Sequence, residues 1–370
     1  MLTLIRIVGG VLVNNLPKSR IEYLSFYRAF AILAVIMIHV TSFPLIRVQQ
    51  GSWKHDFYFI LNTSSQFAVP AFLFLNGFLL FYNYYAMHGR GWIATFYRKR
   101  ILYILIPYLA WSLFYYLFWQ YQTQGNAWLN ADQFMIRLIT GNNYTHLYFF
   151  IIIIQFYVLF PALVHIVQHA KLDKWLILIA LVSQVIFFIL NNHWLHIQRT
   201  GVLFISYFLQ FCAGAYVGMH YEHAVGKLIK KNWAITALFM VGSLLYIFAG
   251  KVYFHWLPAL LPYKAYLNQV IYLWFTLAAS AFLLLLANRI YNVDAMTWVK
   301  RALNSIGAAS FVIFLSHPFF LALWRKYVVD RFGAYYHYLT LLGFVVVLLC
   351  SWGSYLLLAK YRRYTWWITG

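Results

Sequence analysis

The chain has 370 residues, of which 64% are hydrophobic and only 9% are charged, and its mean hydropathy is +0.70. Soluble domains carry about 25% charged residues, so this composition excludes an ordinary soluble protein and predicts a polytopic membrane protein. The formal net charge of +21 is typical of basic loops that face anionic lipid. We therefore expect membrane lipid as the partner of this charge, and no nucleic acid.

Hydropathy predicts an all-α fold with about ten transmembrane helices, because about 20 apolar residues cross a bilayer. The expected spans are residues 24–46, 57–86, 101–120, 147–169, 174–191, 202–220, 233–250, 267–288, 304–327 and 337–358. The second span is long enough to tilt or break, and Pro70 is the expected position of a break. We expect a short N-terminal tail at 1–20, one transmembrane domain at 21–360 and a C-terminal tail at 361–370.

The distribution of basic residues predicts which side the termini face. An even number of spans places both termini on one side, and most of the 28 lysines and arginines fall on that side. The positive-inside rule makes it the cytoplasm. The loop that contains Arg325, Lys326 and Arg331 is a local exception to this pattern.

The first span carries two polar residues, Arg28 and His39, in an otherwise apolar run. Eleven residues at about 100° each bring both side chains to one helix face, roughly 16 Å apart along the axis. Ionisable groups at such depth are costly and usually mark a function. His317 reaches a similar depth in the ninth span, so the two histidines are candidates for lining one cavity. The alternative is that each histidine packs between helices and bonds a backbone carbonyl. The other histidines lie near loops and are expected at the membrane interface.

A second polar concentration, Arg98-Lys99-Arg100, directly precedes the third span. It has two interpretations: a charge anchor at the inner membrane surface, or a clamp for the anionic end of a phosphorylated cofactor. Spacing alone favours the anchor.

Several kinds of site have no sequence signal. There is no phosphate-binding Gly-rich loop and no Cys/His set with metal-ligand spacing, so no metal is expected. The seven acidic residues fall at span ends or in loops. Because no span contains an obvious carboxylate, any general base inside the membrane must be a histidine. Ion-coupled transporters usually bury a carboxylate, so the same absence disfavours ion-coupled transport.

The Arg-x10-His pattern of the first span resembles the acyltransferase 3 family of bacterial membrane O-acyltransferases. Four later segments resemble that family in the same order along the chain: Val69–Phe78, Arg100–Tyr108, His146–Pro161 and Ser310–His317. The chain departs from the family pattern at Asn76, Tyr148 and Phe314, where Ser, Trp and Tyr are common, and its third span lacks a second Arg before the proline. The third-span entry looks most like the subgroup with the membrane subunit of intercellular-adhesin (poly-N-acetylglucosamine) synthesis, thought to O-succinylate or to export that polymer.

This resemblance implies an enzyme of the bacterial cytoplasmic membrane that moves an acetyl or succinyl group from cytoplasmic acyl-CoA to a hydroxyl of a cell-surface polysaccharide or glycolipid precursor. Arg28, Arg98 and Arg100 would then hold the anionic end of acyl-CoA. His39 would accept the hydroxyl proton, and Asn76 or His317 would stabilise the tetrahedral oxyanion. We expect direct transfer, because the spans contain no strong nucleophile beside a base.

Two alternatives stay open. The first is an exporter or flippase of a polysaccharide or a lipid-linked sugar, which the aromatic content of 22% suits. Without a buried carboxylate, ion-coupled transport is disfavoured, but passive export is not. The second is a non-catalytic membrane subunit that scaffolds a polysaccharide synthase. A synthase partner or a homo-oligomer is compatible with either alternative.

Overall fold

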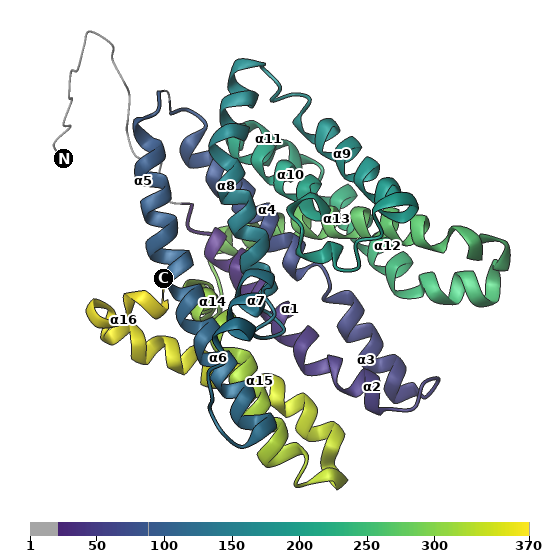
Figure 1. The fold of residues 1–370 in the computed structure, drawn as a ribbon. Helices are drawn as coiled ribbons and strands as arrows, with labels where there is room; N and C mark the ends of the chain where they lie inside the picture. The colour runs from purple at the N-terminus through teal and green to yellow at the C-terminus, as the bar shows by residue number, and fades with distance from the viewer. Residues whose placement is uncertain (1–20, 88, 370) are drawn as a thin grey trace.

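The computed structural model describes residues 21–87 and 89–369, and this part of the chain contains helices and turns but no strand. The tail expected at 1–20 lies outside the described residues. The helices run side by side as a bundle, with α1 near its middle (Figure 1). The all-α prediction is therefore confirmed.

The α-helices have the following bounds, in chain order: α1 Leu24–Ser42, α2 Pro44–Arg47, α3 Trp53–Ser64, α4 Ala68–Tyr84, α5 Gly91–Arg100, α6 Ile106–Gln124, α7 Ala131–Thr140, α8 Tyr148–His169, α9 Leu176–Leu190, α10 Phe208–Met219, α11 Tyr221–Lys230, α12 Asn232–Lys251, α13 Lys264–Asn292, α14 Thr297–Trp324, α15 Tyr336–Lys360 and α16 Arg362–Thr369. A π-helical turn, Ile101–Leu105, joins α5 to α6.

Nine helical segments in the described part of the chain are long and apolar enough to cross a membrane. They are α1 with α2, α3 with α4, α5 with α6, and the segments built on α8, α9, α12, α13, α14 and α15. A shorter apolar segment, Phe204–Met219, contains α10 and corresponds to the remaining expected span. The prediction of a polytopic membrane protein is confirmed, whereas the side on which the termini lie stays a prediction.

Close helix contacts hold the centre of the bundle together. Helix α1 packs against α14, where a Cβ on Gly307 would lie 1.8 Å from the carbonyl oxygen of Ser25. Helix α10 packs equally closely on α4, and a Cβ on Gly214 would lie 1.9 Å from the carbonyl oxygen of Phe74. Small residues at such positions let membrane helices approach backbone to backbone. This packing explains how the short α10 is buried in the bundle.

The second span breaks, but slightly before the expected proline. Helix α3 ends at Ser64 and α4 begins at Ala68, so Pro70 lies in the first turn of α4. Proline is tolerated in a first turn because the N–H that it lacks has no helical partner there, whereas its ring disfavours helix in the residues before it. The segment expected as a C-terminal tail contains α16, and the indole of Trp111 donates to the carbonyl oxygen of Ile368 (3.0 Å).

Candidate functional site

Three histidines meet inside the bundle, and we call them the histidine cluster. The ring of His39 on α1 lies 5.0 Å from that of His317 on α14, measured between centroids. The ring of His146, which precedes α8, lies 5.7 Å from that of His317. His317 and His146 are 0% and 1% exposed, while His39 is partly exposed. The structure thus brings together the two histidines predicted from the sequence and adds a third.

His317 has one bonded nitrogen and one free nitrogen. Its Nδ1 lies 3.0 Å from the carbonyl oxygen of Ile313. A carbonyl only accepts hydrogen bonds, so Nδ1 carries a proton and the neutral ring has its lone pair on Nε2. Nε2 is buried and has no hydrogen-bond partner among the described residues. The bond expected of a packing histidine is therefore present, and it leaves the second nitrogen available for chemistry.

Tyr115 on α6 holds the part of α14 that carries His317. Its hydroxyl donates to the carbonyl oxygen of Leu315 (2.6 Å) and accepts from the backbone N–H of Phe319 (3.2 Å). In a regular α-helix these two backbone groups bond each other. Pro318, which cannot donate, lies between them in α14. The inserted hydroxyl satisfies both backbone groups and fixes the helix next to His317.

His146 is buried because the chain folds tightly back onto α8. Gly141 ends α7 with a positive φ of +69°, and a Cβ there would lie 2.7 Å from the Cα of Tyr148. Neither ring nitrogen of His146 has a hydrogen-bond partner among the described residues, and the same holds for both amide atoms of Asn143. An unsatisfied buried polar group costs about 1–3 kcal/mol. We therefore expect these groups to bond a water molecule or a ligand, or the His146 ring to take up a proton.

The expectation that the remaining histidines lie at the membrane interface is wrong for His146. Its burial depends on the fold of the 141–147 loop onto α6, α8 and α14, which no helical periodicity encodes. The one sequence signal was its place at the start of the fourth-span segment that resembles the family.

Arg325 is a second residue that the sequence placed elsewhere. It follows α14 directly, and its Nη2 donates to the carbonyl oxygen of His39 (2.6 Å). Its guanidinium also lies 5.0 Å from the ring centroid of Phe43. The residue that broke the charge pattern therefore satisfies a carbonyl near the end of α1 and brings positive charge to the histidine cluster.

A cavity of about 200 Å³ lies between α1, α4, α8 and α14, and we call it the Arg28 cavity. Arg28, Asn76, Ser310 and Phe314 are among its lining residues. The ring of Phe314 also lies 5.2 Å from that of His146 and 6.1 Å from that of His317. Phe314 is therefore the wall between the Arg28 cavity and the histidine cluster.

Arg100 reaches the Arg28 cavity through Tyr157. The guanidinium of Arg100 lies 4.7 Å from the ring centroid of Tyr157, a cavity-lining residue, and 5.0 Å from that of Phe96. The Nδ2 of Asn76 donates to the Tyr157 hydroxyl (2.8 Å), and Asn76 Oδ1 is buried without a partner among the described residues. Asn76 thus lines the Arg28 cavity, and Phe314 separates it from the histidine cluster.

Arg98 lies differently from Arg100, although both are on α5. Arg98 and Lys99 are exposed, as charged residues at a membrane surface are. Of the three arginines expected to bind the donor, the structure places Arg28 and Arg100 beside the cavity and Arg98 on the surface. No group of three or more His, Cys, Asp or Glu side chains that could hold a metal ion occurs in the described ranges.

These features define a polytopic helical membrane protein with a buried polar site inside the bundle. The chain belongs to the acyltransferase 3 family, because residues 21–356 match that family's acyltransferase domain. It is 24% identical over 325 residues to the "Probable poly-beta-1,6-N-acetyl-D-glucosamine export protein" of Staphylococcus aureus (strain MW2), with 83% of each chain covered. It is 26% identical over 316 residues to the protein of the same name from Staphylococcus epidermidis, covering 83% of this chain and 82% of the relative. No solved structure matches. The resemblance to the family and to its poly-N-acetylglucosamine subgroup is confirmed.

Proposed function

We propose that this membrane acyltransferase transfers an acetyl or succinyl group from acyl-CoA to a hydroxyl of a cell-surface polysaccharide or glycolipid precursor, with His39 as the general base. The observation that carries the proposal is the pair of imidazoles, partly exposed His39 and buried His317, at 5.0 Å between ring centroids, next to a cavity that Arg28 lines. Neutral imidazole has a reference pKa of about 6.5, which suits proton transfer near neutral pH.

The proposed reaction is a direct transfer. The hydroxyl oxygen of the acceptor attacks the thioester carbonyl while His39 takes the hydroxyl proton. The tetrahedral oxyanion then collapses, the C–S bond breaks, and the thiolate leaving group recovers the proton from His39. The products are an ester and free CoA.

The oxyanion requires a hydrogen-bond donor or a cation. The neutral form of His317 presents only a lone pair at Nε2, so it serves as a donor only when it carries a second proton. Asn76 keeps one N–H beyond the one that it gives to Tyr157, and it reaches the oxyanion only when Phe314, which separates it from the histidine cluster, rotates away. Arg325, whose guanidinium bonds the His39 carbonyl, supplies a fixed positive charge at the end of α1 that carries His39.

The donor is proposed to enter from the end of the bundle where α1 begins. Ligand pockets are usually about 300–1,000 Å³, so the Arg28 cavity of about 200 Å³ suits a slender arm or an acyl group, not a nucleotide. The nucleotide end would therefore stay outside the cavity. Arg28 and Arg100 are placed to hold its negative charge, and Phe314 must rotate for the thioester to reach the histidine cluster.

Export of a polysaccharide is the second candidate, because the two staphylococcal relatives are named as export proteins. A non-catalytic role beside a polysaccharide synthase belongs with this candidate. The export role and the non-catalytic role both predict that the histidine cluster serves only helix packing. Both also predict that the protein does not consume acyl-CoA.

A labelled donor separates these functions. Purified protein in nanodiscs is incubated with acetyl-CoA or succinyl-CoA carrying a labelled acyl group, and with an oligomer of β-1,6-linked N-acetylglucosamine. The proposal predicts label on the oligomer and an equal amount of free CoA. No transfer from either donor, together with movement of unlabelled oligomer into sealed proteoliposomes, would transfer the assignment to export.

A further inference from the structure

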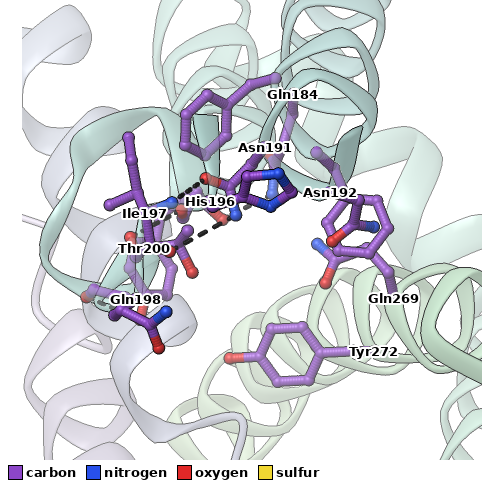
Figure 2. Close-up of a pocket in the computed structure, with 14 residues that line it drawn as sticks. Gln184, Asn191, Asn192, His196, Ile197, Gln198, Thr200, Gln269 and Tyr272 are labelled. Carbon is purple, nitrogen blue, oxygen red and sulfur yellow. Dashed lines mark hydrogen bonds between the residues drawn. The ribbon is translucent and has the colours of Figure 1, made fainter. Parts of the chain in front are cut away.

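A second pocket lies away from the Arg28 cavity and takes no part in the proposed chemistry. Its volume is about 450 Å³, within the range of about 300–1,000 Å³ that ligand pockets occupy. It lies between α9, the segment 191–207 and α13 (Figure 2). We call it the amide pocket, because five of its lining residues carry side-chain amides: Gln184, Asn191, Asn192, Gln198 and Gln269.

Two of these amides build the wall of the pocket. Asn191 Oδ1 accepts from the backbone N–H of Ile197 (2.8 Å), which fixes the turn after α9. Gln184 Oε1 accepts from the backbone N–H of Leu209 (3.0 Å), and its Nε2 donates to the carbonyl oxygen of Ser206. Backbone groups that no helix satisfies are thereby paired, so the wall is held in place without a ligand.

The other amides are free to bind a ligand. The side chains of Asn192, Gln198 and Gln269 form no hydrogen bond with another described residue, and neither does the hydroxyl of Tyr272. In Figure 2 these four side chains surround an open space: Asn192 lies beside Gln269, and Gln198 lies across the space from Gln269 and Tyr272 of α13. The arrangement offers several uncommitted donors and acceptors around one volume.

The chemistry of the lining selects a class of ligand. None of the lining residues is Asp, Glu, Lys or Arg, and His196 is the one lining side chain that can become charged near neutral pH. The pocket therefore has no permanent charge with which to bind a phosphate or a cation. Each carboxamide both donates and accepts, as a sugar hydroxyl does. The rings of Phe187, Phe188, Tyr207 and Tyr272 also line the pocket and give apolar faces for the C–H faces of a pyranose. An acyl chain would leave the free amides unpaired at a cost.

The amide pocket lies on the same side of the bundle as His146. Helix α8 begins two residues after His146, and Gln155 on α8 bonds the carbonyl oxygen of Val202 (2.8 Å) and the N–H of Phe204 (3.2 Å). The segment that forms one wall of the pocket is therefore bonded to α8, the helix that follows His146.

We propose that the amide pocket binds an uncharged saccharide and is the subsite that holds the acceptor chain. The identification of this saccharide as the acceptor rests on the proposed function. Saccharide binding itself does not depend on acyl transfer. Affinity should depend on neutral hydroxyl and amide groups, so it should change little with salt.

The test is isothermal calorimetry of the full chain in nanodiscs. The probes are an N-acetylglucosamine oligomer, a neutral maltose-series oligomer of equal length, and the cationic de-N-acetylated glucosamine oligomer. The variants are Gln198→Ala, Gln269→Ala and Asn192→Ala. Gln124→Ala, an exposed amide outside the pocket, is the matched control, and titrations without acyl-CoA measure binding apart from chemistry.

We expect a neutral oligomer to bind wild type and Gln124→Ala alike, and each pocket variant to bind about 3- to 10-fold more weakly, as the loss of one neutral hydrogen bond implies. Two outcomes overturn the inference: no binding of either neutral oligomer by wild type, or binding that all three pocket variants retain. Gln198 and Asn192 are exposed, so their variants keep the test valid if Gln269→Ala does not fold. Pocket-dependent binding without acyl transfer would retain this inference and reject the proposed function.

Discussion

The imidazole rings of His39 and His317 lie 5.0 Å apart, although they come from the first and the ninth predicted spans. The contact exists because α1 and α14 pack at the distance that Gly307 permits. Arg28 belongs to the same arrangement, since it shares its cavity with Ser310 and Phe314 of α14. One pair of helices thus carries both the proposed base and the proposed donor contact.

Arg28→Lys should raise the KM for acyl-CoA by about tenfold, even though the charge is kept. A planar guanidinium makes two parallel bonds to a phosphate, whereas an ammonium acts as a point charge. Steady-state kinetics with acetyl-CoA and succinyl-CoA measure this. Unchanged kinetics in a folded variant would remove Arg28 from the donor site.

The two arginines of α5 should differ in effect. Arg100→Ala should raise the KM for the donor more than it lowers kcat, as the loss of uniform binding does, because Arg100 stacks on the cavity residue Tyr157. Arg98→Ala, whose side chain is exposed, is the matched control and should change KM less than twofold. Equal effects of the two substitutions, or an effect on membrane insertion alone, would make both residues charge anchors.

His146→Leu should stabilise the protein against unfolding and lower its rate of acyl transfer. Replacing an unsatisfied buried polar ring by an apolar side chain removes a penalty of about 1–3 kcal/mol, so thermal unfolding in detergent should shift upward. The rate of acyl transfer should fall, because the substitution removes two buried ring nitrogens from beside His317. A destabilised variant with full activity contradicts both statements and makes His146 a packing residue.

Tyr115→Phe should destabilise the protein by about 1–3 kcal/mol, because it leaves the carbonyl of Leu315 and the N–H of Phe319 without their partner. It should also lower kcat, since the helix that carries His317 is no longer fixed. Unfolding temperature and kcat are measured together, and Tyr121→Phe, at an exposed position of α6, serves as the control. Loss of stability without loss of kcat would limit Tyr115 to a structural role.

The sequence predicted the parts of this site that helix geometry encodes. Eleven-residue spacing placed Arg28 and His39 on one face, and span depth paired His39 with His317. It did not predict His146, which reaches the cluster through a loop whose path depends on Gly141 and on tertiary packing. Nor did it distinguish Arg98 from Arg100, because the difference between them is the ring of Tyr157 on a distant helix.

The free amides of the second pocket illustrate the same limit. Asn192 and Gln198 follow the fifth predicted span, where polar residues are ordinary in a loop, and Gln269 lies in the eighth. Only the fold brings them around one volume. The break in the second span differs, because a local rule about proline predicted that it exists. The observed break lies a few residues before Pro70, the expected position.

The most direct test of His39 as the general base is the rate of acyl transfer by purified His39→Ala beside wild type, with acetyl-CoA and succinyl-CoA as donors. His223→Ala, an exposed histidine on α11, is the matched control. We predict that His39→Ala folds, inserts and still binds the donor, but releases free CoA at least about 100-fold more slowly, as the loss of a general base implies. Wild-type rates from His39→Ala would show that its imidazole is not the base.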